Sequence, residues 1–248
     1  MERNGIAADP RTLQGRARLS LRRGYALLEA VDISDRETPS CLLNLYEGEH
    51  LRRYAKICSE IRKEDCPAFR GMFLEHGTLV TVFDRSEGES IDWFFYRGDG
   101  WSLQDRLCYA ELLLHGALSL ANLPPEVSCA ALLSENVLID PESRRVRFRW
   151  AIRPMDGMNP RETALLAADQ AKKILPRTLF AGEEEQRFLD QLEEGLFRNV
   201  VALYGRWRQA KQAIETERGE FEKKSLLRRA CILLSRTIRR RLEQGGLR

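Results

Sequence analysis

The stretch Ser134-Glu-Asn-Val-Leu-Ile-Asp-Pro-Glu-Ser-Arg-Arg-Val-Arg-Phe148 contains two short apolar segments on either side of a polar turn. Val137 to Ile139 and Val146 to Phe148 favour strands, and Asp140-Pro-Glu-Ser143 has the composition of a turn. The stretch therefore predicts a small β-hairpin. The region before this hairpin contains most of the predicted strands and the region after it is helical, so the hairpin decides how the whole chain is interpreted.

The region before the hairpin contains most of the predicted strands. Hydrophobic spacing and turn composition predict strands at 25–33, 41–46, 69–75 and 79–83, and helices at 49–64, at 91–96 and from 102 to about 122. Ser102 is a favourable N-cap for the long helix, and Pro124-Pro125 is expected to end it. Residues 1–24 are either a mobile lead-in or a poorly marked first strand.

The region after the hairpin is helical. Helices are predicted at about 161–175, 183–204, 206–218 and 221–243, so the layout is α+β. The hydrophobic fraction is 43%, which is enough for a core and excludes wholesale disorder. No stretch approaches the roughly 18 uncharged apolar residues of a membrane span.

Cysteine usage bears on metal binding and on the compartment. No C-x-x-C motif and no pair of histidines at metal-ligand spacing is present, so a zinc site is not favoured. We expect buried, reduced thiols, a cytoplasmic protein and no secretory signal. The cysteines are Cys41, Cys58, Cys66, Cys108, Cys129 and Cys231.

The order of elements resembles that of a protein kinase, with a five-stranded first lobe that carries one helix and a helical second lobe with a small hairpin at the cleft. Residues 134–148 resemble the kinase catalytic-loop stretch PENILIDPxxxxVKL. Beyond these residues, the resemblance covers about 20–175 in element order only. It implies a two-lobed fold with an extra C-terminal helix. The expected parts are a lead-in or first strand (1–24), a β-rich N-lobe (25–85), a helical C-lobe (86–204) and a basic helical tail (205–248).

Phosphoryl transfer by a kinase needs a glycine-rich loop and a strand lysine that hold the phosphates. The resemblance places the loop positions at Ser20, Arg22 and Tyr25, with Gly24 nearby but out of register. The lysine position carries Asn44, whose neutral amide does not offset phosphate charge. Glu60, the position of the helix carboxylate that pairs with this lysine, has no partner there and is expected to be solvated.

The catalytic and metal-binding aspartates of the kinase pattern are also replaced. The catalytic position is Ala131, and the metal-binding position is Trp150, with Arg149 beside it. Asn136 occupies the position of one magnesium ligand, yet a single neutral oxygen does not hold Mg²⁺. A role as a magnesium ligand and a role in bridging backbone carbonyls of the loop are weighted equally for this residue. The resemblance therefore implies a pseudokinase without catalytic residues, metal or cofactor. Asn44 and Asn136 are its degenerate cleft positions, and Trp150 is expected to fill the cleft.

The C-terminal tail carries a strong positive charge. Residues 205–248 hold 13 lysines and arginines against five acids, a net +8, whereas the rest of the chain is at −5. In the last predicted helix, one face carries Leu227, Ala230, Cys231, Leu234, Ile238 and Leu242. Much of the rest is basic, with Lys223, Lys224, Arg228, Arg229, Arg236, Arg239, Arg240 and Arg241.

Three roles remain open for this helix. A basic amphipathic helix binds an anionic membrane surface or an acidic protein. Alternatively, its apolar face packs on the body and its arginines are solvated. Nucleic-acid binding, with Arg206-Trp207-Arg208 stacking on a base, is disfavoured because the tail has few aromatic residues and the body is acidic.

The leading functional hypothesis is a catalytically inactive, kinase-like binding scaffold or regulator with an unidentified protein partner. The hypothesis includes a peripheral position at a membrane surface, reached through the arginine-rich tail (Arg228, Arg229, Arg236, Arg239, Arg240 and Arg241). An atypical phosphotransferase, with Asp140 or Asp156 as the carboxylate, and a nucleic-acid adaptor are the other hypotheses. The oligomeric state is left open.

Overall fold

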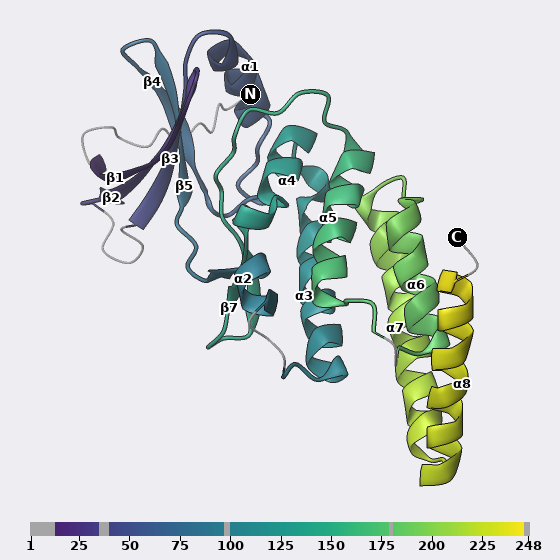
Figure 1. Cartoon of the computed structure of the whole chain (residues 1–248). Coiled ribbons are helices and arrows are strands. Elements are labelled where there is room, and N and C mark those ends of the chain that lie inside the picture. The colour runs from purple at the N-terminus through teal and green to yellow at the C-terminus, as the bar shows by residue number, and fades with distance from the viewer. Residues whose placement is uncertain (1–12, 35–39, 97–99, 179–180, 246–248) are drawn as a thin grey trace.

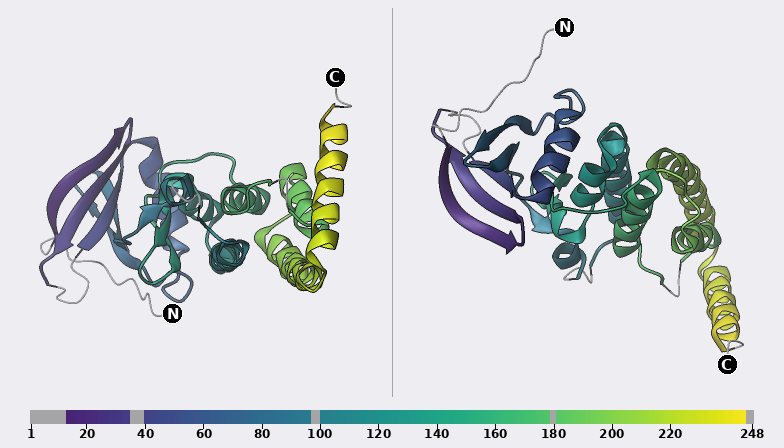
Figure 2. Two further views of the ribbon diagram at one scale, coloured as in Figure 1. Left: turned by 60° about the horizontal axis from the view of Figure 1, so that its bottom comes forward. Right: turned by 90° about the horizontal axis from the view of Figure 1, so that it is seen from above.

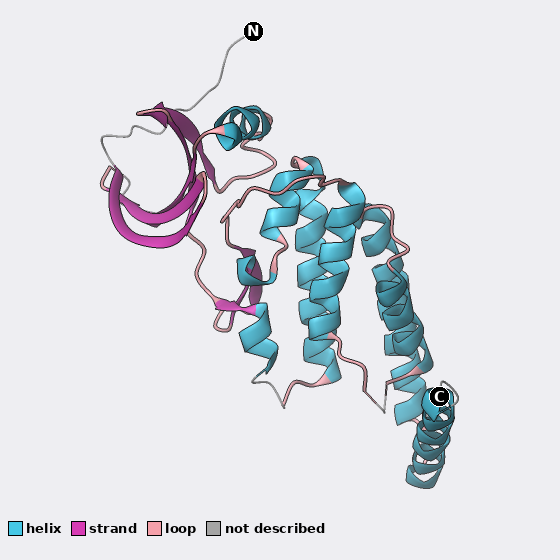
Figure 3. Cartoon of the chain, turned by 45° about the horizontal axis from the view of Figure 1, so that its top comes forward, coloured by secondary structure: helices cyan, strands magenta, loops and turns pink. Residues whose placement is uncertain are grey.

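The computed structural model describes residues 13–34, 40–96, 100–178 and 181–245 (Figure 1). A curled five-stranded sheet lies at one end of the molecule and a set of helices extends to the other end (Figure 3). The predicted strand at the start of the chain is present over Leu13–Arg22, and residues 1–12 of the predicted lead-in lie outside the described residues.

The five strands form one antiparallel sheet in the order β1-β2-β3-β5-β4. Successive residues of β2 and β3 point to opposite sides of the sheet, and on the side that packs on the helices Tyr25, Leu27, Leu42 and Tyr46 enter the main core. On the other side, Cys41 and Leu43 join a smaller buried cluster. The strands are β1 (Leu13–Arg22), β2 (Tyr25–Asp32), β3 (Ser40–Tyr46), β4 (Phe69–Glu75) and β5 (Thr78–Asp84).

Helix α1 (Glu49–Ser59) packs against this sheet through Tyr54, Ile57 and Cys58. The predicted helix 49–64 is therefore too long. It stops at Ser59 because the chain turns through 62–66, where the Cys66 amide donates to the Arg62 carbonyl, and this turn buries Cys66.

The middle of the chain contains the predicted hairpin. Strands β7 (Val137–Asp140) and β8 (Arg145–Phe148) pair in antiparallel register, with Val137 opposite Phe148, and the two-residue strand β6 (Glu89–Ser90) extends their sheet. The predicted short helix is α2 (Ile91–Tyr96). The long helix is α3 (Leu103–Ser119), capped by Ser102 in a capping box, and a 3-10 turn at Leu120–Asn122 follows.

Pro124 and Pro125 were predicted to end the long helix, but they also begin another one. Pro124 is the N-cap and Pro125 the first residue of a further helix, α4 (Pro125–Ala131). Proline is well tolerated there because the first amides of a helix have no intrahelical acceptor. A 3-10 turn at Ser134–Asn136 then leads into β7.

Four helices follow: α5 (Pro160–Ile174), α6 (Glu183–Glu194), α7 (Val200–Glu222) and α8 (Leu226–Gly245). The predicted helices 183–204 and 206–218 are wrong at their junction. Gly195, with φ +62°, ends α6 in the left-handed conformation, and the Asn199 side chain caps α7 by accepting from the Ala202 amide. Gly205 lies inside α7 instead of ending a helix.

One core joins the sheet to α7. Trp207 is fully buried on α7, packs on Phe188 with ring centroids 5.2 Å apart, and donates from Nε1 to Glu111 on α3 at 2.7 Å. Glu111 also accepts from the Tyr204 hydroxyl at 2.7 Å and lies 3.5 Å from the Lys211 ammonium. This carboxylate therefore connects α3 to α7.

The same carboxylate gives the fold a defined dependence on pH. Burial alone would raise the pKa of Glu111, but the bonds from Tyr204 and Trp207 and the charge of Lys211 hold its pKa below the ordinary 4.5. A lowered folded-state pKa contributes stability that is complete above the unfolded value and is lost as the pH falls through the folded value.

We therefore expect Glu111→Gln to lower the free energy of unfolding by about 1–2 kcal/mol at pH 7 and by much less at an acidic pH below the lowered folded-state pKa of Glu111. Urea unfolding at the two pH values measures the difference. The matched control is Glu60→Gln, because Glu60 is exposed. An equal loss at both pH values would contradict the assignment.

The cysteines divide into two groups. Cys41, Cys58, Cys66 and Cys129 are buried free thiols, and burial raises the pKa of the Cys58 thiol to about 12. The expectation that Cys108 and Cys231 are buried is wrong, because both are exposed. Each lies in an apolar stretch of a helix but on its solvent side. Within the described part of the chain, no helix is long and apolar enough to cross a membrane.

Candidate functional site: the cavity between the sheet and the helices

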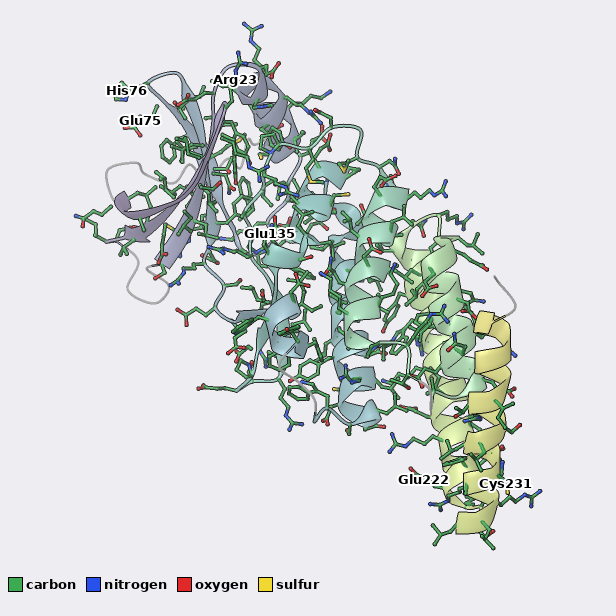
Figure 4. The ribbon with its side chains drawn as sticks, in the orientation of Figure 1. Arg23, Glu75, His76, Glu135, Glu222 and Cys231 are labelled. Carbon is green, nitrogen blue, oxygen red and sulfur yellow. The ribbon has the colours of Figure 1, made fainter. Side chains whose placement is uncertain are left out.

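A small cavity of about 180 Å³ lies where the sheet meets the hairpin region. Its walls come from β1, β2, the 3-10 turn before β7 and the segment after β8. Figure 4 labels Glu135 in this part of the molecule, between the sheet and the helices. The lining residues are Leu19, Ser20, Arg22, Tyr25, Leu27, Glu135, Asn136, Arg149, Ala151 and Arg153.

Asn44 lies in β3, is fully buried and does not line the cavity. Its Oδ1 accepts from the Tyr25 hydroxyl at 2.9 Å and from the Ile152 amide at 2.7 Å. Its Nδ2 donates to the Trp150 carbonyl at 3.0 Å. Because every polar atom of this side chain is bonded, Asn44 ties the sheet to the segment that follows β8.

Asn136 holds the same segment from the other side. Its Nδ2 donates to the Ala151 carbonyl at 3.0 Å and to the Ala130 carbonyl at 2.7 Å. The Asn136 side chain is buried, and its Oδ1 has no hydrogen-bond partner among the described residues. The predicted bridging of loop carbonyls is present, through Nδ2, and the magnesium-ligand role of Oδ1 stays a prediction. Asn44 and Asn136 together clamp residues 150–152, and we call this arrangement the asparagine clamp.

Tyrosines from the sheet and α1 extend this connection along the chain. The Tyr46 hydroxyl donates to the Ile152 carbonyl at 2.7 Å, and the Tyr54 hydroxyl accepts from the Met155 amide at 3.0 Å. The two rings stack at 4.4 Å. Arg53, next to Tyr54, donates to the Met155 carbonyl at 2.6 Å and pairs with Asp156. Residues 150–156 are thus bonded to β3 and α1 along most of their length.

Trp150 is buried, as the sequence predicts. Its ring lies parallel to Phe83 at the end of β5, with centroids 5.6 Å apart, and meets Phe148 edge-on at 6.4 Å. The indole therefore fills the space between the sheet and the hairpin.

The cavity itself is positively charged. Arg22, Arg149 and Arg153 line it, and Glu135 pairs with Arg153 at 3.1 Å. Among the described residues, neither Arg22 nor Arg149 forms an ion pair. Burial raises the pKa of the Tyr25 phenol well above its ordinary value, and the three arginines oppose that rise. Because the local charge is positive, a divalent cation is disfavoured here.

The candidate carboxylates of an alternative catalytic site lie elsewhere. Asp140 caps the turn of the hairpin by accepting from Ser143 and the Glu142 amide, and these bonds lower its pKa. Asp156 is exposed and pairs with Arg53. Neither lines the cavity. Over the described ranges, no group of three or more histidine, cysteine, aspartate or glutamate side chains is placed to hold a metal ion.

The predicted glycine-rich loop is a tight turn between β1 and β2. Arg22 pairs with Tyr25, so Arg23 and Gly24 form a two-residue connection, and Gly24 has φ +70°. Glycine suits this turn because L-residues rarely adopt that conformation. Ser20, Arg22 and Tyr25 line the cavity, whereas a Cβ on Gly24 would contact His50 on α1 at 3.1 Å.

The remaining predicted positions are accounted for as follows. Ala131 is buried at the end of α4, and Glu60 is exposed. Arg228 is exposed, whereas Arg229 and Arg236 turn toward α7. The side chains of Arg239, Arg240 and Arg241 lie outside the described residues. Tyr46, Tyr54 and Arg53 were missed, because only the folded chain brings them to residues 152–156.

No protein-family model matches this sequence, and no curated protein matches it either. Solved structures do match, and 1805 chains are similar to it in fold. One is the crystal structure of Rad53 1-466 in complex with AMP-PNP, with a TM-score of 0.54 and 9% sequence identity. The match covers 79% of this chain and 65% of that chain.

The chain has a protein kinase-like fold. At 9% identity, this likeness concerns the fold alone. The predicted two-lobed α+β architecture is thereby confirmed. In this kinase-like chain, the asparagine clamp occupies the region where the sequence resemblance placed the strand lysine, the magnesium ligand and the metal-binding aspartate.

Proposed function

We propose that this kinase-like chain is a catalytically inactive binding scaffold, a regulator of another protein that works without nucleotide. The asparagine clamp carries the proposal. Both polar atoms of Asn44, at the lysine position, are bonded within the fold, and Asn136 Nδ2, at the magnesium-ligand position, bonds to residue 151.

The size and charge of the cavity support the same proposal. Pockets for small molecules usually measure about 300–1,000 Å³, so a cavity of about 180 Å³ is too small for a nucleotide. Transferred phosphate also needs a metal ion and a carboxylate near the nucleophile. The cavity instead contains three arginines and a single carboxylate that is paired with one of them.

The alternative phosphotransferase is less well supported, because Asp140 and Asp156 bond elsewhere. The nucleic-acid adaptor is also less well supported. Trp207, which the sequence offered as a stacking residue, is fully buried and bonded to Glu111. A partner surface outside the cavity remains for the scaffold, and the tail helix provides one.

Thermal unfolding with and without nucleotide tests the proposal. We expect millimolar ATP and Mg²⁺ to leave the melting temperature unchanged. A ligand at about 100 times its dissociation constant would add about 2.7 kcal/mol to the free energy of unfolding, a readily measured shift. ATP without Mg²⁺, with Arg149→Ala as the control variant, separates simple anion binding at the arginines from magnesium-nucleotide binding. A Mg²⁺-dependent shift would contradict the proposal.

A further inference from the structure

Helix α8 is attached to the body by its arginines. The Arg229 and Arg236 guanidinium groups lie over the Phe221 ring of α7, 5.9 and 6.0 Å from its centroid. Arg236 also pairs with Glu217, and Arg229 donates to the Lys224 carbonyl at 2.9 Å. Ile232 and Leu233 on the same side are only half-buried. None of the described side chains of α8 is buried, so this attachment contributes little apolar burial.

The apolar stripe of α8 faces away from the body. Leu227, Leu234 and Ile238 are 82%, 62% and 58% exposed. Cys231 between them is also exposed and lies at the edge of the groove between α8 and α7. At about 100° per residue, these four positions fall within about 60° of one another, roughly opposite to the side that carries Arg229 and Arg236. Of the three roles left open for this helix, packing of the apolar face on the body is therefore wrong for the described residues. Arg229 and Arg236 pack on α7 instead, whereas Arg228 is exposed.

The position of α8 leaves this stripe accessible. The helix lies at the end of the molecule opposite to the sheet, beyond α6 and α7 (Figure 2). Figure 4 labels Cys231 on α8 and Glu222 at the end of α7. The stripe is set in strongly basic sequence, because residues 223–241 contain eight lysines and arginines and no acid.

We infer that the outward face of α8, Leu227, Cys231, Leu234 and Ile238, docks on an anionic membrane surface. A helix with an apolar stripe and basic flanks lies in the plane of the interface, where its apolar side chains enter the acyl region and its cations meet lipid phosphates. Each lysine or arginine near an anionic leaflet adds to the attraction. Among the arginines of α8 whose side chains are described, Arg228 is the exposed one, because Arg229 and Arg236 are held against α7. A second copy of α8 is a poor occupant, because α8 carries six arginines and one acid, and the copy would bring six more arginines to the same stripe.

This inference rests on the part of the proposed function that gives the scaffold a partner surface outside the cavity. The nucleotide experiment tests the proposal of an inactive cleft, and the vesicle experiment below tests the docking of α8 on a membrane. Either proposal can therefore be contradicted without the other.

The test is co-sedimentation of the full chain with vesicles of phosphatidylcholine alone or with about one third phosphatidylserine. We expect binding to the anionic vesicles only, weakened strongly between about 0.1 M and 1 M salt as the Debye length falls from about 10 Å to 3 Å. The double variant Leu227→Ser/Leu234→Ser should bind at least about tenfold more weakly, because two apolar side chains no longer enter the lipid. Both residues are exposed, so the variant is expected to fold.

The matched control is Leu196→Ser/Val201→Ser, which removes two equally exposed apolar side chains outside α8. It should bind like the unaltered chain. Three results would overturn the inference: no binding to anionic vesicles at low salt, equal binding to neutral vesicles, or salt-sensitive binding that the Leu227→Ser/Leu234→Ser variant retains. The first would assign the stripe to a protein partner, and the last would assign the binding to charge alone.

Discussion

Replacing Asn44 by leucine is expected to lower the free energy of unfolding by at least about 3 kcal/mol, because three buried groups lose their partner at once. The Tyr25 hydroxyl, the Trp150 carbonyl and the Ile152 amide all bond to this side chain. A buried polar group left without a partner costs about 1–3 kcal/mol. Urea unfolding followed by far-UV circular dichroism measures the loss.

Two further variants keep this prediction testable if Asn44→Leu does not fold. Tyr25→Phe removes only one partner and should cost about 1 kcal/mol. Asn122→Leu is the matched control, since Asn122 is exposed and makes one bond, to Asp65; it should change stability by no more than about 0.5 kcal/mol. If Asn44→Leu proved as stable as this control, the asparagine clamp would have no structural role.

The variant Asn44→Lys tests whether the strand lysine of the kinase pattern can be restored at this position. The position is fully buried and Glu60, the expected partner carboxylate, is exposed, so the ammonium would be buried without a counter-charge. We expect a loss of stability at least as large as for leucine, and no stabilisation by ATP and Mg²⁺. A stable variant that gains nucleotide binding would contradict the prediction and mean that the cleft is one residue away from binding a nucleotide.

The second large effect concerns the residue that fills the cleft. We expect Trp150→Ala to lower the free energy of unfolding by about 3–5 kcal/mol, the range for emptying a buried aromatic site. The indole is only 8% exposed and is in contact with Phe83 and Phe148. Chemical unfolding at pH 7 provides the measurement.

Trp93→Ala is the control for this change, because Trp93 is 48% exposed. It should cost much less than Trp150→Ala. Trp150→Phe keeps most of the ring and should fall between the two. If all three variants were equally stable, Trp150 would not be part of the core, and the space between the sheet and the hairpin would be open.

The parts of the fold with strong local signals were predictable. The hairpin at 134–148 combines β-branched segments with a turn sequence, and Ser102 with Asp105 forms a capping box that local sequence alone favours. Helix α4 was missed because a proline pair signals both the end of one helix and the start of the next. The break between α6 and α7 was misplaced because Gly195 and Gly205 are locally alike. Packing of Leu203 and Trp207 keeps the second glycine inside a helix.

The sequence predicted which residues replace the kinase residues at the candidate site, but not which hydrogen bonds the replacing residues make. The sequence places Asn44 and Asn136 at degenerate positions, yet Asn44 bonds to residues 106 and 108 positions further along the chain. No periodicity in the sequence reports such a contact. The same limit applies to α8. Its composition predicts two faces, but only the positions of Phe221 and Glu217 on α7 determine that Arg229 and Arg236 turn inward.

The asparagine clamp has a mechanical consequence. Because residues 150–152 are held by β3 on one side and by the turn before β7 on the other, the sheet and the helices cannot rotate about this segment without breaking bonds on both sides. The core then continues from α3 to α7 through Glu111. The sheet and α7 are therefore parts of one rigid unit, and any two partners that bound at its opposite ends would be held at a fixed distance from each other.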